Sequence, residues 1–286
     1  MSLVRILQTT RQTLTHTFRV DGVLTDVTGD VTATLKRLDG TSVEAVTAGH
    51  AGVGTYTYTP PAQALLDSLT LDWSGTLAGA AVSVRDYVEI VGGHLFDLAE
   101  ARAAHSGLSS ESTYPWSLLA AKRIEVEQEC EGICRRAFVP RFSRRVLDGN
   151  DRDRLAVPDS ELRAVRAVSV GGVAWLAPDV AALGFTDFGT IVRPGGALWP
   201  AGLRNVVLEY EHGLDFPPGT IREAGILRLR SRIAVTRSGV PDRATSYTVA
   251  DGGVYRLSMP GKERTGVPEV DGAYEKHTRA RRAVFA

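Results

Sequence analysis

The sequence has few cysteines, no excess of charge and no long apolar run, and each absence excludes a class of protein. Two cysteines in 286 residues cannot supply a four-ligand thiolate zinc site or a disulfide framework. The 33 basic and 33 acidic side chains cancel, so overall charge predicts neither a nucleic-acid-binding protein nor a membrane-surface protein. No apolar stretch is long enough to span a bilayer, and residues 1–8 lack the apolar core of a signal peptide. We therefore expect a cytoplasmic protein without membrane contact.

The chain does contain enough apolar material for two folded domains, since 43% of its residues are hydrophobic. Residues 1–93 show short stretches of alternating polarity, separated by turn residues such as Asp39–Gly40 and Pro60–Pro61. This pattern is typical of an immunoglobulin-like β-sandwich. The predicted strands cover residues 14–20, 31–36, 54–59, 69–73 and 82–91. With six basic and nine acidic residues, this region has a net charge of −3.

From residue 94 onward the apolar spacing becomes helical. We predict a short helix over 95–102, a long amphipathic helix after Pro115 and a second long helix after Thr220. The predicted stripes are Trp116, Leu119, Val126, Cys130, Ile133 and Ala137 on one long helix and Ile226, Leu229 and Ile233 on the other. Such stripes pack against each other. The predicted β segments are 138–147, a hairpin over 164–175, 204–212 and a hairpin over 247–257, and a last helix begins at Pro268. The predicted class is α+β multidomain, with a helical domain over 94–286 that contains inserted β-hairpins.

Two groups of residues resemble catalytic or metal sites, and we favour a structural role for both. Cys130 and Cys134 lie four residues apart without further ligands at suitable spacing, which indicates buried core positions. Glu209, Glu211, His212 and Asp215 gather at a strand end, but no serine or cysteine stands in a nucleophile motif. We therefore predict no enzyme and no catalytic, cofactor or metal site. A hydrolase that uses His212 with Glu209 or Asp215 remains the weakest alternative.

Arginines cluster in two places. The helix after Thr220 carries Arg222, Arg228, Arg230, Arg232 and Arg237 against Glu223, and the end of the chain carries Lys276, Arg279, Arg281 and Arg282 with no acid after Glu275. Two interpretations stay open: ordinary solvated charge, or a surface that meets an acidic protein or passing DNA through non-specific phosphate attraction. Tyr247, Tyr255 and Phe285 lie in polar segments and are candidate anchors for a partner.

Four segments together resemble a known family. They are residues 95–102 (LFDLAEAR), 127–141 (EQECEGICRRAFVPR), 207–213 (VLEYEHG) and 239–247 (GVPDRATSY). In this order they are similar to the head-to-tail adaptor proteins, or connectors, of long-tailed phages that infect actinobacteria. The resemblance covers about residues 94–280 and does not include the N-terminal region.

The resemblance implies a structural virion protein in the phage neck. It would form a homo-oligomeric, dodecameric ring between the portal protein at the capsid vertex and a stopper or tail-completion protein, with DNA passing through the centre. It further implies a C-terminal portal-docking tail containing Lys276, Arg279, Arg281, Arg282 and Phe285. Arg222, Arg228, Arg230 and Arg232 would line the lumen or the subunit boundaries, and Tyr247 and Tyr255 would anchor loops. The alternative is a surface-binding module whose immunoglobulin-like domain recognises carbohydrate or host protein, which requires exposed aromatic residues on one sandwich face.

Overall fold

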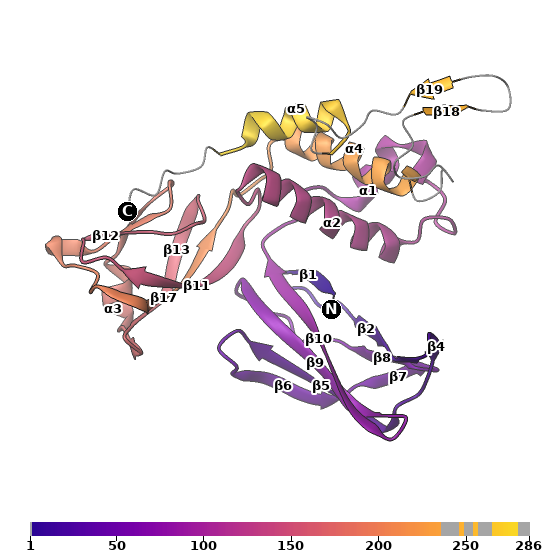
Figure 1. The fold of residues 1–286 in the computed structure, drawn as a ribbon, viewed down its shortest axis with the longest axis horizontal. Helices are drawn as coiled ribbons and strands as arrows, with labels where there is room; N and C mark the ends of the chain where they lie inside the picture. The colour runs from indigo at the N-terminus through magenta and orange to yellow at the C-terminus, as the bar shows by residue number, and fades with distance from the viewer. Residues whose placement is uncertain (1, 236–245, 249–253, 257–264, 280–286) are drawn as a thin grey trace. The chain divides into compact units, whose positions relative to one another are not determined.

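The computed structural model describes residues 2–235, 246–248, 254–256 and 265–279 (Figure 1). Its class is mixed α+β, as the sequence predicts, and β structure dominates with 41% of residues in strands and 25% in helices. The chain forms two compact units, Met1–Gly93 with Val139–Asp215 and His94–Phe138 with Phe216–Ala286. The chain first passes between them at Gly93–His94, where the sequence predicts a domain boundary. The division into an N-terminal domain and a domain over 94–286 stays a prediction.

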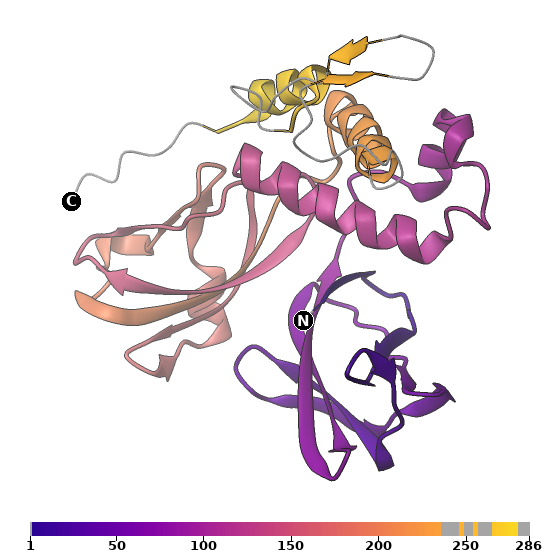
Figure 2. The same ribbon diagram turned by 45° about the vertical axis from the view of Figure 1, so that its right-hand side comes forward.

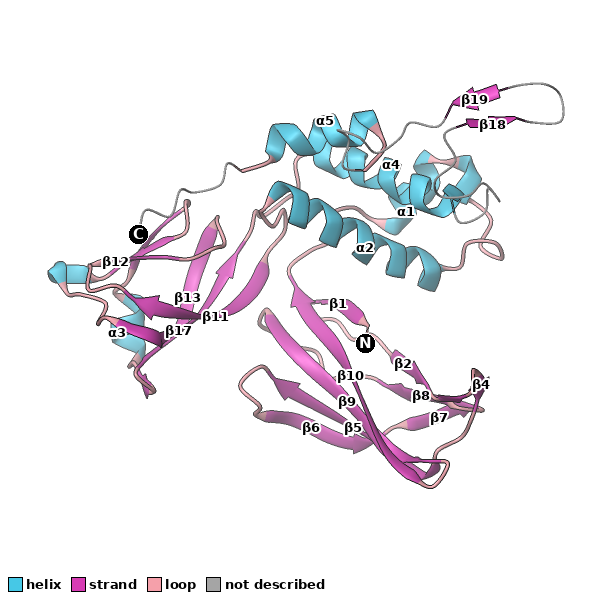
Figure 3. Cartoon of the chain, viewed as in Figure 1, coloured by secondary structure: helices cyan, strands magenta, loops and turns pink. Residues whose placement is uncertain are grey.

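Residues 3–91 form the first part of the β-rich unit (Figure 3). A five-stranded sheet has the order β1-β10-β9-β5-β6, and a three-stranded sheet has the order β2-β8-β7. β1 pairs in parallel with β10, and the other pairs are antiparallel. The strands are β1 (Leu3–Leu7), β2 (Leu14–Thr17), β3 (Arg19–Val20), β4 (Val23–Leu24), β5 (Thr28–Arg37), β6 (Ser42–Thr47), β7 (Gly49–Gly52), β8 (Thr55–Tyr58), β9 (Asp67–Leu77) and β10 (Ala80–Val91).

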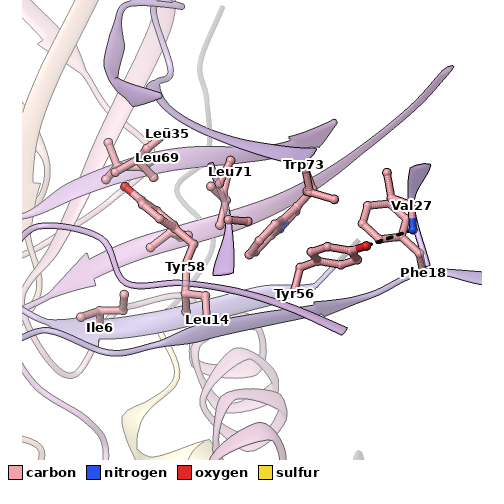
Figure 4. Close-up of a cluster of buried hydrophobic side chains, with 14 of the residues drawn as sticks. Ile6, Leu14, Phe18, Val27, Leu35, Tyr56, Tyr58, Leu69, Leu71 and Trp73 are labelled. Atoms are coloured by element: carbon pink, nitrogen blue, oxygen red, sulfur yellow. Dashed lines mark hydrogen bonds between the residues drawn. The ribbon is translucent and has the colours of Figure 1, made fainter. Parts of the chain in front are cut away.

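One hydrophobic cluster joins these two sheets (Figure 4). Leu71 and Trp73 of β9 are fully buried in it, together with Tyr56 from the smaller sheet. The Tyr56 hydroxyl accepts a hydrogen bond of 3.0 Å from the backbone N–H of Val27, so its polar end is satisfied inside the apolar cluster. The predicted strands are therefore present, while the immunoglobulin-like arrangement stays a prediction.

Residues 141–212 form the second part of the same unit. A four-stranded sheet has the order β11-β17-β13-β14, and a three-stranded sheet has the order β12-β16-β15. In β17 the alternation of Val206, Leu208 and Tyr210 buries one face, as predicted. The elements are β11 (Arg141–Gly149), β12 (Arg154–Ala156), β13 (Leu162–Val170), β14 (Val173–Ala174), α3 (Ala177–Ala181), β15 (Gly184–Thr186), β16 (Thr190–Val192), a 3₁₀ turn (Pro194–Gly196) and β17 (Gly202–His212).

The other unit is mainly helical (Figure 2). The two long helices, α2 and α4, pack against each other as their apolar stripes predict, and α5 packs on both. Hydrogen bonds near both ends of α5 show that α4 and α5 are antiparallel. Thr220 in the first turn of α4 contacts His277 at the end of α5, and Arg228 in the middle of α4 contacts Thr265, just before α5. The elements are α1 (Leu98–Ala104), a 3₁₀ turn (Ser106–Leu108), α2 (Trp116–Cys134), α4 (Gly219–Val235), β18 (Ser246–Thr248), β19 (Val254–Arg256) and α5 (Pro268–His277).

Two helix boundaries differ from the prediction for local reasons. α1 begins after Asp97 rather than at Leu95, because the Asp97 carboxylate caps the helix by accepting the N–H of Ala99 at 2.6 Å. α2 ends at Cys134 because Arg135 adopts the left-handed conformation, with a φ of 56°. Ala137 is therefore buried but lies outside the helix, and Trp116 at the other end is 43% exposed. The buried stripe of α2 is consequently shorter than predicted.

Candidate functional site

The helical unit contains most of the residues to which the sequence assigns a partner role, and its core is apolar. Leu119, Val126 and Cys130 of α2 are fully buried, as is Leu229 of α4. The stripe of α4 recurs every three or four residues, which places it on one face of the helix. The two faces therefore meet over several turns and hold the helices in a fixed register.

Charged residues flank this apolar contact and link the same two helices. The Arg228 guanidinium donates two hydrogen bonds to the Glu129 carboxylate, at 2.7 and 3.0 Å. Arg232 donates to Glu125 at 3.0 Å and also contacts Glu129. Burial of the Glu129 carboxyl raises its pKa, but the hydrogen bonds from Arg228 and Arg232 outweigh this effect and hold the pKa below its ordinary value. The carboxylate therefore stays charged and clamps α4 to α2.

The predicted arginine cluster consequently divides into internal and outward-facing members. Arg228 and Arg232 form the internal clamp just described, and Arg222 lies 3.4 Å from Glu100 of α1 with both side chains partly exposed. Arg230 is exposed and makes no ion pair with the described residues. Arg237 lies outside the described residues. The role of Arg222, Arg228, Arg230 and Arg232 at a lumen or subunit boundary stays a prediction, and Arg230 is the exposed member of the four that pairs with no described carboxylate.

The acidic partners of the clamp were missed by the sequence interpretation, although a signal for them exists. Glu125 and Glu129 stand four residues apart on α2, and Arg228 and Arg232 stand four residues apart on α4. Two pairs with the same helical spacing present matching charges on facing helices. The net charge within α4 alone hides this match, because the compensating acids lie about a hundred residues earlier in the chain.

The two cysteines belong to the helical core. Cys130 and Cys134 are fully buried and form no disulfide, and Tyr274 of α5 covers them, with the Cys134 thiol donating to the Tyr274 carbonyl oxygen at 3.5 Å. The hydrogen bond to Cys134 and burial both raise the pKa of the Cys130 thiol. The described residues contain no group of three or more potential metal ligands. Both cysteines are therefore core side chains without access to solvent, and the raised pKa keeps the Cys130 thiol protonated.

The predicted docking tail is only partly described. Lys276 lies in the last turn of α5 and borders a groove between α4 and α5. The backbone N–H of Arg279 donates to the Cys134 carbonyl oxygen at 3.0 Å, which ties the end of α5 to the end of α2. Arg281, Arg282 and Phe285 lie outside the described residues. Tyr247 and Tyr255 face each other in the register of the β18–β19 hairpin, and their side chains are likewise not described.

The polar strand end around His212 does not bring together the groups that the hydrolase alternative needs. Glu209 pairs with Arg144 at 3.3 Å, and Asp215 pairs with Arg163 at 2.5 Å. His212 is buried, and its Nε2 lies 3.0 Å from the Ser143 hydroxyl of β11, a contact that the sequence interpretation missed. Each carboxylate thus has an arginine partner, and His212 faces the core side of β17 with Tyr210.

Comparison with known proteins gives no match, either to a family model or to a curated protein. None of the helices in the described part of the chain combines the length and apolar character needed to cross a bilayer. Among residues 2–93 the large aromatics Phe18, Tyr56, Tyr58 and Trp73 are buried, and Tyr87 is the exposed one. Residues 2–93 therefore lack the exposed aromatic cluster that the alternative of carbohydrate recognition by a predicted N-terminal sandwich requires.

Proposed function

We propose that this protein is a structural connector of a phage neck, which forms a ring between the portal protein and the stopper or tail-completion protein. In this proposal DNA passes through the ring, and the protein works through binding geometry rather than through catalysis. The N-terminal β region, proposed to be an immunoglobulin-like sandwich, decorates the outside of the neck. The C-terminal segment that contains Lys276, Arg279, Arg281, Arg282 and Phe285 contacts the portal.

The observation that carries this proposal is the clamp between α2 and α4. A connector must hold its binding surfaces at fixed positions while neighbouring copies and partners join at the edges. The clamp joins residues about a hundred positions apart. Together with the apolar contact between α2 and α4, its charge-assisted hydrogen bonds make the helical unit a rigid support. Arg222, Arg230 and Lys276 lie on the exterior of this support and offer charge to partners. Two of the family-like segments, 95–102 and 127–141, also contact each other in this unit. The backbone N–H of Leu95 donates a hydrogen bond of 2.8 Å to the buried carboxylate of Glu127.

Mass measurement of the full chain with and without purified portal tests the proposal. We expect a closed ring, and a dodecamer of this 30.7 kDa chain has a mass of about 370 kDa. We also expect the ring to bind portal more weakly as ionic strength rises, because exposed charges contribute to the contact. A chain that stays monomeric and does not associate with portal at any salt concentration would overturn the proposal.

A further inference from the structure

The surface between α4 and α5 contains a groove that no part of the described chain fills. Its volume is about 440 Å³, and its floor consists of the small or apolar residues Ala224, Leu227, Gly272 and Ala273. The first half of α4, residues 220–227, and most of α5, residues 269–276, line the groove. A groove of this kind can accept a short peptide segment with one or two apolar side chains.

Gly272 keeps this groove open at a cost to the helix. It lies inside α5, where glycine is less favourable than alanine by about 1 kcal/mol. Its backbone does not require glycine, since its φ is not positive, and a Cβ at this position would meet no atom of the described residues within 4 Å. Packing among the described residues therefore does not explain the glycine, whereas an occupant lying against the floor of the groove does.

The rim of the groove is acidic. Glu223 of α4 and Glu269 of α5 line it, are exposed, and form no ion pair with a described residue. Lys276 stands at the opposite end from Glu269, near Thr220. The groove thus combines an apolar floor with two carboxylates that have no cationic partner among the described residues, which suits an occupant carrying basic residues beside apolar ones.

The chain itself contains such a segment. Residues 278–286 read TRARRAVFA, with Arg279, Arg281 and Arg282 followed by Val284 and Phe285. The hydrogen bond from the Arg279 N–H to Cys134 shows that the chain leaves α5 beside the end of α2, whereas the groove lies between α5 and α4. A segment that reaches the groove of its own copy must first pass around α5, which is about 10 Å across. The groove of a second copy requires no such path.

We infer that the groove between α4 and α5 binds the basic C-terminal segment, residues 280–286, of a second copy of this chain. Arg281 and Arg282 pair with Glu223 and Glu269, and the apolar side chains that follow lie on the floor beside Gly272. This inference deepens the proposed function, because it supplies a contact between neighbouring copies of the ring. The same segment then docks either on a sister copy or on portal, so the two contacts compete.

A charge exchange between copies tests the inference on the full chain. One variant carries Arg281→Glu with Arg282→Glu, and the other carries Glu223→Lys with Glu269→Lys. We expect each variant alone to self-associate at least about tenfold more weakly than the wild type, by sedimentation velocity. Mixing the two should restore association, because the reversed tail of one copy then meets the reversed groove of the other. Placing all four substitutions in one chain should restore it as well.

A steric variant keeps the test independent of charge. Gly272→Leu fills the groove and favours the helix, so we expect an unchanged fold and self-association weakened by at least about tenfold. Gly132→Leu is the matched control, because Gly132 lies on α2, away from the groove, and also has no atom within 4 Å of a Cβ. We expect this control to associate like the wild type.

Three results would overturn the inference: a monomeric wild-type chain, no effect of Gly272→Leu, or variants that regain wild-type behaviour only within one chain and not on mixing. The last result would assign the groove to the tail of the same copy. Portal binding is measured on every variant. Self-association through the groove without any portal binding would contradict the connector proposal alone. A ring that binds portal, and whose assembly is unaffected by the groove substitutions, would contradict this inference alone.

Discussion

Arg228 of α4 and Glu129 of α2 form a two-point ion pair, with nitrogen–oxygen distances of 2.7 and 3.0 Å. Both side chains are largely shielded, with exposed fractions of 14% and 16%. The Arg228 guanidinium also donates to the Thr265 carbonyl oxygen at 3.0 Å, just before α5. One arginine therefore connects three segments of the helical unit, and its charge is used inside the protein rather than on its surface.

Removal of this arginine should weaken the helical unit. We expect Arg228→Ala to lower the free energy of unfolding by about 2–3 kcal/mol, because it leaves the Glu129 carboxylate shielded from water with one cationic partner fewer. Denaturant unfolding followed by the helical circular dichroism signal measures this. Arg230→Ala is the matched control on the same helix, and we expect a change within about 0.5 kcal/mol. Equal effects of the two substitutions would show that the ion pair does not stabilise the fold.

Asp86 should make the β-rich unit sensitive to acid. Burial raises the pKa of this carboxyl, but the hydrogen bonds from His16 and Ser2 outweigh burial and lower the pKa from 3.8 to about 2. A lowered folded-state pKa means that the stabilisation is complete above about pH 4 and is lost as the pH falls toward 2. We expect Asp86→Asn to cost about 2 kcal/mol at pH 7 and much less at pH 2.5. The exposed Asp30→Asn is the control, and a cost for Asp86→Asn that does not vary with pH would contradict this account.

The cysteines should be unreactive until the helical unit unfolds. Cys130 and Cys134 are fully buried, and the pKa of the Cys130 thiol is raised, so little thiolate exists at pH 8. We expect a thiol-specific reagent to modify neither cysteine in the native chain and both in guanidinium. The reaction is followed by mass spectrometry. Rapid modification of one cysteine in the native chain would mean that the covering contact with Tyr274 opens readily.

The elements that the sequence predicts best are those with a strong local signal. The alternation in β17 and the proline at the start of α5 each specify their element without help from distant residues. The predicted start of α1 differs from the observed one because the apolar side chains of Leu95 and Phe96 look helical, although they are buried in a bend before the Asp97 cap.

Distant relationships set the limit of sequence interpretation. The matching four-residue spacing of the acidic pair on α2 and the basic pair on α4 becomes informative only once the two helices are known to face each other. The charge of α4 therefore looked more available to partners than it is. Likewise, the spacing of Ala224 and Gly272 in two separate helices gives no sign that they share the floor of one groove. Both depend on how α4 and α5 pack, which follows from the whole helical core.

The hydrogen bonds of residues 277–279 indicate which C-terminal deletions should destabilise the fold. His277 contacts the Thr220 hydroxyl at 3.0 Å, the Thr278 hydroxyl donates to the Tyr274 carbonyl oxygen at 2.7 Å, and the Arg279 N–H bonds to Cys134. Deletion of residues 276–286 removes all three hydrogen bonds, so we expect it to lower the free energy of unfolding by about 2–3 kcal/mol. Deletion of residues 280–286 keeps them, and we expect unfolding within about 0.5 kcal/mol of the wild type.

The shorter deletion is therefore the one that tests the docking role. Under the connector proposal, phage that carry the chain without residues 280–286 should accumulate filled heads that lack tails, because the portal contact is lost while the subunit stays folded. Electron microscopy of lysates shows this directly, and supplying the full-length chain in trans should restore complete particles. Complete particles from the shorter deletion alone would show that Arg281, Arg282 and Phe285 are dispensable. The portal contact would then have to involve residues before 280, and Lys276 and Arg279 are the basic candidates there.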